Sequence, residues 1–261
     1  LPSARKSWTA VVVPSGIAEK VQTGMGIFID GVRGEFDVNE LHFTEIFSGK
    51  GAWKVVSVER RAEVIHLMAG VMAGLGLPIV HQTITHFTML DHPEHEIPMH
   101  VGDWNLDNLS HFGLLMLCSQ ASRHIRIMKE RSPADFELPF PLYVDQGILP
   151  AGGERKLPNW QDVIEGPTAR FYNSADVVGL QLADFAAFII NRSQWIAVTR
   201  KPGPVAKSDE AILRAAAGLN ILNLPRRNVV PDEFGQERYE EWLSANRGAK
   251  GLTPRPPKSR P

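Results

Sequence analysis

The sequence predicts an α/β fold in which helices cover both faces of a mixed β-sheet. Two observations predict this class. Short β-branched or apolar runs alternate along the chain with segments whose apolar residues recur every three or four positions, the spacing of one helix face. The chain has 261 residues, 43% of them hydrophobic, which is enough for one large core, and it contains no internal repeat.

The first third of the chain predicts two strands separated by helices. Residues 7–14 form a short β-branched run that ends in a turn-forming Pro-Ser-Gly sequence, which is typical of a strand. From Ile17 onward, apolar residues recur at helical spacing. Ser57 is the expected N-cap of a second helix that closes at residues 74–76, a Gly-Leu-Gly sequence. Residues 77–84 return to strand character.

Residues 39–43 and the middle of the chain predict a further alternation of extended segments and helices. Alternating polar and apolar residues over 39–43 indicate a short strand or an extended loop. A long helix is expected from Leu106 to about residue 130. Two more strands are expected over 139–145 and 168–172, followed by a nearly all-apolar helix over 178–196. We therefore assign residues 1–198 to one α/β domain.

The end of the chain differs in composition. A Lys-Pro-Gly-Pro linker follows Arg200, and helices are expected from a cap at Ser208 and from residues 231–233, so residues 199–244 are predicted to be a helical appendage. Residues 245–261 contain five Lys or Arg, four Pro and no acidic residue, which is typical of a disordered basic tail. We interpret this tail as solubilising; an arm that contacts phosphate groups is the alternative.

Composition excludes several classes of protein. No apolar stretch reaches the roughly 18 residues of a membrane helix, so the chain is not expected to span a membrane. The 28 basic and 29 acidic residues nearly cancel, so an anionic partner such as nucleic acid must be held locally. The single cysteine, Cys118, lies in an apolar run, which favours an inert thiol in a reducing compartment and a cytoplasmic location.

The helix over 178–196 carries an ionisable side chain among apolar neighbours. Gln181 and Asp184 share one of its faces. Burial of an unpaired carboxylate costs several kcal/mol, so Asp184 is expected to meet a cation, a hydrogen-bond donor or a shifted pKa. From spacing alone, pairing with an arginine or with the helix dipole is the simpler interpretation, and a chemical role is the alternative.

Other acidic residues follow strands or lie on one face of them. Asp145 ends a predicted interior strand, the end at which ligands collect in open α/β sheets, although a turn-forming aspartate is the simpler interpretation. Glu40 and His42 share one face of the 39–43 segment, which makes them candidate site residues. The simpler interpretation is that this face is the solvent-exposed side of the segment. Carboxylates from strand ends and a helix are the ligands that Mg²⁺ and Mn²⁺ require.

Several of these residues occur together in a known family. The segments 171–174 and 178–186 and the Glu-Leu-His-Phe sequence at 40–43 resemble the signature elements of the domain of unknown function family numbered 3800, and Asp145 matches a third acidic position more loosely. The resemblance spans about residues 7–196. It implies a ribonuclease H-like fold and, by that kinship, a metal-dependent phosphodiesterase.

The sequence lacks one element of the family pattern. The family opens with a strand that ends in Asp-Glu-Ser-Gly, and no segment before Ser7 matches it. We therefore expect that strand, with a first metal ligand, to lie upstream of Leu1. Residues 27–31 imitate it in sequence, but the helical spacing around them favours a coincidence.

Histidines form a second candidate metal site. Six of the nine lie between His81 and His111, and His86, His92 and His95 lie near acidic residues in a loop. Because no His-Glu-x-x-His motif occurs, we favour the interpretation that these are loop histidines without a metal. A zinc or manganese site is the alternative. The absence of a Gly-x-Ser-x-Gly or phosphate-loop motif argues against acyl transfer and nucleoside triphosphate hydrolysis.

The sequence thus predicts a divalent-metal-dependent nuclease or phosphodiesterase. Asp145, Asp184 and Glu40 are the expected ligands of Mg²⁺ or Mn²⁺, which would polarise the phosphate and activate water. Other polar residues, expected to orient these ligands or the substrate, are Gln181, His42 and Ser174. The alternative is a non-catalytic binding module of the same fold that contacts nucleic acid or a protein partner.

Overall fold

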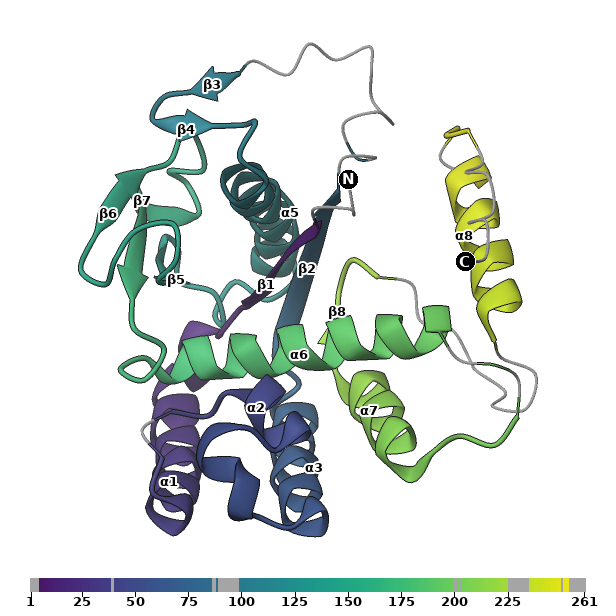
Figure 1. Ribbon diagram of the computed structural model, residues 1–261. Helices are drawn as coiled ribbons and strands as arrows, with labels where there is room; N and C mark the ends of the chain where they lie inside the picture. Colours follow the sequence, from purple (N-terminus) through teal and green to yellow (C-terminus); the bar gives the residue numbers. More distant parts are fainter. Residues whose placement is uncertain are drawn as a thin grey trace.

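The computed structural model describes residues 5–38, 40–85, 88, 99–199, 201, 203–224, 235–249 and 251–253 (Figure 1). The described elements, in chain order, are β1 (Arg5–Val11), η1 (Ser15–Ile17), α1 (Ala18–Phe36), α2 (Phe43–Ser48), η2 (Gly51–Val55), α3 (Val58–Leu75), β2 (Pro78–Thr85), β3 (His100–Val101), β4 (Trp104–Asn105), α5 (Leu109–Arg131), β5 (Phe140–Asp145), β6 (Glu154–Lys156), β7 (Ile164–Tyr172), α6 (Val178–Thr199), α7 (Lys207–Gly218), β8 (Asn220–Ile221) and α8 (Gln236–Ala249).

The strands form two small mixed sheets and a two-stranded ribbon. In the first sheet β2 lies at the centre, antiparallel to β1 and parallel to β8. In the second sheet β7 lies at the centre, parallel to β5 and antiparallel to β6. The mixed α/β class is therefore confirmed. Among the described residues, however, the strands form two separate mixed sheets instead of the expected single sheet, and β1 and β5 are edge strands of these two sheets.

The two sheets are joined through the segments that flank β1 and β5. The Ser15 hydroxyl, just after β1, donates to the carbonyl oxygen of Asp135 and accepts from the backbone amide of Glu137, at 3.0 and 2.7 Å. Residues 135–137 lead into β5, so the segment after β1 lies beside the segment before β5. The β3–β4 ribbon is held by the Trp104 indole, which donates to the Lys156 carbonyl oxygen on β6 at 2.7 Å.

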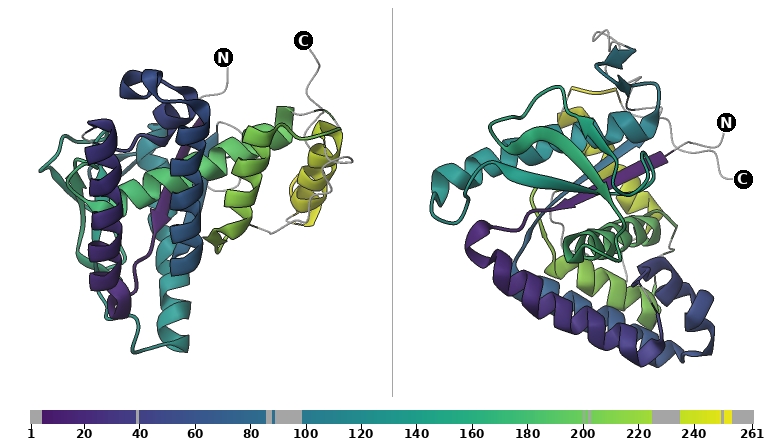
Figure 2. Two further views of the ribbon diagram at one scale, coloured as in Figure 1. Left: turned by 90° about the horizontal axis from the view of Figure 1, so that it is seen from below. Right: turned by 90° about the vertical axis from the view of Figure 1, so that its left-hand side faces the viewer.

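Two hydrophobic clusters form the core, one on each face of the first sheet. Neighbouring residues of β2 contribute to opposite clusters: Ile79 belongs to the cluster with α1, α3, α6 and α7, and Val80 belongs to the cluster with α5 and the second sheet. In Figure 1, α6 crosses the middle of the molecule, with α1, α2 and α3 on one side and α5 and the second sheet on the other. Figure 2 shows this layering from two further sides.

Local sequence signals explain the helix ends. The Ser57 hydroxyl accepts from the Arg60 backbone amide at the start of α3, as predicted, and Gly76 ends this helix in the left-handed conformation that glycine tolerates best. Helix α1 buries residues spaced three or four positions apart, namely Val21, Met25, Ile29 and Val32, and it contains residues 27–31. The sequence there that imitates the family's first strand is therefore helical.

The segment after α1 partly departs from the prediction. Asn39 lies outside the described residues. Of the two expected alternatives, residues 40–42 form the extended loop rather than the short strand, and α2 begins at Phe43, within the expected segment. The expected alternation nevertheless holds, since Leu41 and Phe43 are buried in the core. Glu40 and His42 lie on the other side of this connection, where both retain some exposure.

The region after Arg200 packs into the same core. Helix α7 begins at Lys207, one residue before the expected cap at Ser208, and its Ile212 is buried with residues of α3 and α6. Strand β8 pairs with the start of β2. The predicted helix start at 231–233 lies outside the described residues, and the described helix α8 begins at Gln236.

The predicted disordered tail begins as a helix. Helix α8 extends to Ala249, and the Arg247 guanidinium donates to the Thr253 carbonyl oxygen. Residues 254–261 lie outside the described part of the chain. Among the described helices, none has the length and apolar character needed to cross a membrane.

Candidate functional site

The predicted site residues come from four segments that meet at the carboxyl ends of β5 and β7. Asp145 is the last residue of β5 and pairs with Tyr172, the last residue of β7. The loop after β7 and the first turns of α6 lie beside these strand ends because β5 and β7 are parallel. The connection between α1 and α2 packs against the same turns. The predicted residues in this region are Glu40, His42, Asp145, Ser174, Gln181 and Asp184.

Glu40 is held by two side chains. The buried Ser174 hydroxyl donates to its Oε1, and the His42 Nε2 lies 3.2 Å from its Oε2. Both carboxylate oxygens therefore have a partner. The Glu40 side chain is 20% exposed and that of His42 is 54% exposed, so the imidazole forms the outer edge of the site.

Helix α6 fixes the connection that carries Glu40. The Oε1 of Gln181, which is 1% exposed, accepts from the backbone amide of Leu41, and the Oδ2 of Asp184 accepts from that of Phe43, both at 3.4 Å. The donor that the sequence led us to expect for Asp184 is thus a backbone amide at the start of α2 rather than an arginine. A buried amide and a partly buried carboxylate satisfy each other here.

The carboxylates also affect one another electrostatically. Burial raises the pKa of Asp184; the Phe43 amide and His42 oppose this increase, whereas the charges of Asp145 and Glu40 add to it. Burial likewise raises the pKa of Asp145, and Glu40 adds to this increase, while the Gln146 amide, His42 and Ser174 act in the opposite direction. Asp145, Asp184 and Glu40 thus lie close enough to repel one another.

The fit of this cluster to a divalent metal ion is partial. Its donors are oxygen atoms of carboxylates, which Mg²⁺ and Mn²⁺ prefer. In the part of the chain that the structure describes, however, no three Asp, Glu, His or Cys side chains surround a common point as metal ligands do. The donor set therefore fits a hard cation in kind, and the Glu40 oxygens are engaged by Ser174 and His42 instead.

The histidine-rich segment offers no described metal site. His86, His92 and His95 lie outside the described residues. His81 is buried in the first sheet, where its two ring nitrogens lie 2.8 and 3.0 Å from the Thr9 and Thr83 hydroxyls. Burial, with a contribution from the Arg5 charge, lowers the pKa of His81 to about 4.

Cys118 is a core residue. It is buried in α5, and burial raises the pKa of its thiol to about 12. A thiol that stays protonated is a poor nucleophile, so Cys118 is not a reactive residue.

Two features of the site were not found by sequence reasoning. Arg33, at the end of α1, donates to the Ala175 carbonyl oxygen at 2.6 Å and so ties α1 to the loop after β7. No local signal reveals this contact, because the two residues are far apart in the chain.

The second feature is a pair of tyrosines, Tyr143 and Tyr172, whose ring centroids lie 5.3 Å apart. Strand alternation could have indicated Tyr143, which precedes Asp145 by two residues.

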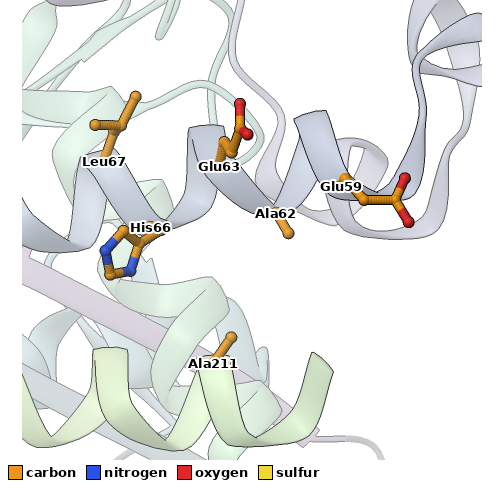
Figure 3. Close-up of a pocket in the computed structure, with 6 residues that line it drawn as sticks. All are labelled: Glu59, Ala62, Glu63, His66, Leu67 and Ala211. Atoms are coloured by element: carbon orange, nitrogen blue, oxygen red, sulfur yellow. The ribbon is translucent and has the colours of Figure 1, made fainter. Parts of the chain in front are cut away.

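A described pocket of about 470 Å³ lies elsewhere, between α3 and α7 (Figure 3). The side chains that line it are Glu59, Ala62, Glu63, His66, Leu67 and Ala211. None of the candidate site residues takes part in it. We therefore locate the candidate chemistry at the carboxylate cluster rather than in this pocket.

Comparison with protein-family models, with curated proteins and with solved structures finds no significant match to this chain. The resemblance to the domain of unknown function family numbered 3800 therefore stays a prediction.

Proposed function

We propose that the chain is a divalent-metal-dependent phosphodiester hydrolase, a nuclease or phosphodiesterase with a ribonuclease H-like fold. One observation supports this proposal above all: Asp145, Asp184 and Glu40 come from three distant segments and meet in one cluster, where the Glu40 charge adds to the raised pKa values of Asp145 and Asp184. Two unit charges about 4 Å apart repel by roughly 4 kcal/mol at an effective dielectric constant of 20. A cation relieves this repulsion.

Asp145, Asp184 and Glu40 are the residues that would hold the ion. Mg²⁺ or Mn²⁺, when bound, polarises a phosphoryl oxygen and lowers the pKa of bound water. Glu40 would have to exchange its contacts with Ser174 and His42 for the ion. Asp184 would keep one oxygen for the Phe43 amide, which fixes its orientation.

The other polar residues have separate roles in this proposal. His42 is the most exposed of them, and its Nε2 is the atom that would take up or release a proton near the reacting phosphate. Ser174 would orient Glu40, and Gln181 would hold the backbone that carries both Glu40 and His42. The buried thiol of Cys118 is compatible with a reducing, cytoplasmic environment.

Hydrolysis of bis(p-nitrophenyl) phosphate with Mn²⁺ or Mg²⁺ tests the proposal. We expect the chain to release p-nitrophenolate, and Asp145→Asn and Asp184→Asn to lose this activity. Asp107→Asn, which changes an exposed carboxylate outside the cluster, is the matched control and should retain it. Equal rates in all four proteins, or no metal-dependent release by any of them, would contradict the proposal.

A second candidate is a non-catalytic binding module of the same fold. The observation that favours it is that Ser174 and His42 already engage both oxygens of Glu40. Such a module would bind nucleic acid with a steep salt dependence that Asp184→Asn leaves unchanged. Loss of binding when the chain is truncated after Thr253, without any turnover by the full chain, would favour this candidate.

A further inference from the structure

Beside the carboxylate cluster lies a pair of aromatic rings that the proposed hydrolysis does not use. We propose that Tyr143 and Tyr172 stack an unpaired nucleobase, so that the substrate is a single-stranded nucleic acid. This inference rests on the proposed function, because it names the substrate class of the same site. Strand register and ring geometry support it.

Strand alternation places the rings on the same face as Asp145. On β5, Val144 points into the core and is buried, so Tyr143 and Asp145 point to the opposite face. On β7, Phe171 is buried in the same core, so Tyr172 points to the face of Asp145. The pairing register sets Asp145 directly opposite Tyr172. A group stacked on the tyrosines is therefore next to a proposed ligand of the metal.

The two rings form an open aromatic surface. Their planes lie at 75° in an edge-to-face arrangement, and Tyr143 is 44% exposed. An exposed ring fixed by a second ring offers a rigid surface that loses little conformational freedom when a ligand binds. Every nucleobase has a flat π-face that stacks on such a surface, which is how proteins bind unpaired bases of any sequence.

The arginine on this face already has acidic partners. Arg170 pairs with Tyr143 across the strands, but its guanidinium lies 3.0 Å from Glu165 and 3.5 Å from Glu154. Two carboxylates therefore offset its positive charge. Stacking on the rings, rather than attraction of phosphate groups, is therefore the contact on which this inference depends. A DNA duplex hides its bases in the stack, so only a single strand presents a base that can stack on these rings.

Binding of two oligonucleotides in EDTA tests this inference without turnover. One is a fluorescein-labelled eight-residue deoxyadenosine oligonucleotide, and the other has the same backbone with abasic sites. We expect the chain to bind the first more tightly, and Tyr143→Leu to weaken that binding roughly tenfold. Tyr143→Phe, which keeps the ring, should stay within about twofold of the unchanged chain. Trp195→Leu, which removes an exposed ring on α6, is the matched control and should have no effect.

The outcomes separate this inference from the proposed function. Equal affinity for the base-bearing and abasic oligonucleotides, or unchanged binding by a folded Tyr143→Leu variant, would overturn the inference. Metal-dependent hydrolysis could still be observed in that case. Conversely, binding that depends on the Tyr143 ring, in a chain that hydrolyses no phosphodiester with Mn²⁺, supports the stacking site and contradicts the hydrolase. Rescue by Tyr143→Phe excludes a general effect on folding.

Discussion

The Ser174 hydroxyl donates a hydrogen bond to the Glu40 carboxylate, although 134 positions separate the two residues. Ser174 follows β7, and Glu40 follows α1, so this contact joins the second sheet to the helical side of the molecule. Gln181 and Asp184 reinforce the junction from α6. The candidate site is therefore also a structural junction, and changes at its residues should affect stability as well as chemistry.

Removal of the Ser174 hydroxyl should destabilise the fold. We expect Ser174→Ala to lower the free energy of unfolding by about 1–3 kcal/mol, because a partly buried carboxylate loses a hydrogen-bond donor. Urea denaturation measures this change. Ser208→Ala, at an exposed position in α7, is the control and should change the stability by less than about 0.5 kcal/mol. Equal stabilities of the Ser174 variant and the unchanged chain would show that the contact contributes nothing.

Gln181 should be sensitive to a change that preserves its size. Gln181→Leu leaves the Leu41 backbone amide without its acceptor in a buried position, so we expect a loss of about 1–3 kcal/mol in the free energy of unfolding. Gln161→Leu, at an exposed position, serves as the control. A Gln181→Leu variant as stable as the unchanged chain would argue against a stabilising role for the amide contact.

Asp184 should make stability fall as the pH rises. Its pKa in the folded state is raised above the unfolded value, so the folded state binds more protons and stability is lost as the pH increases through the folded pKa. We expect Asp184→Asn in EDTA to gain stability relative to the unchanged chain as the pH rises above the ordinary carboxyl pKa of 3.8. Urea denaturation at several pH values measures this difference. A difference that is constant with pH, or that changes in the opposite direction, would contradict the expectation.

His81 should have the opposite dependence on pH. Its folded pKa of about 4 lies below the ordinary value of 6.5, so its contribution to stability is present above pH 6.5 and is lost as the pH falls toward 4. The loss should reach about 3 kcal/mol. His81→Gln should remove this part of the pH dependence, and His66→Gln, at an exposed position, should retain it. Identical slopes in both variants would contradict this assignment.

Local signals in the sequence predicted most of the individual elements. The cap at Ser57 and the turn at Gly76 fixed α3 because both act through bonds and backbone preferences within a few residues. The face shared by Gln181 and Asp184 follows from helix periodicity, and both residues do meet the connection after α1. The position of Asp145 at the end of β5 follows from the strand pattern.

Features that depend on distant contacts could not be predicted in the same way. The pairing of β8 with β2 joins a two-residue strand to a partner more than a hundred residues away, and so short a segment carries no periodicity. The contact of Arg33 with the Ala175 carbonyl oxygen similarly depends on how α1 packs. The division into two sheets also reflects long-range pairing, which hydrophobic patterns along the chain do not specify.

Binding of Mn²⁺ measured by isothermal titration calorimetry tests the central claim most directly. We expect the chain to bind Mn²⁺, and Asp145→Asn, Asp184→Asn and Glu40→Gln each to weaken binding at least about tenfold, because each removes a charged oxygen ligand. Asp107→Asn should bind as the unchanged chain does. The proposal that these carboxylates form a metal site would be contradicted if the chain bound no Mn²⁺, or if all three cluster variants bound Mn²⁺ as tightly as the unchanged chain.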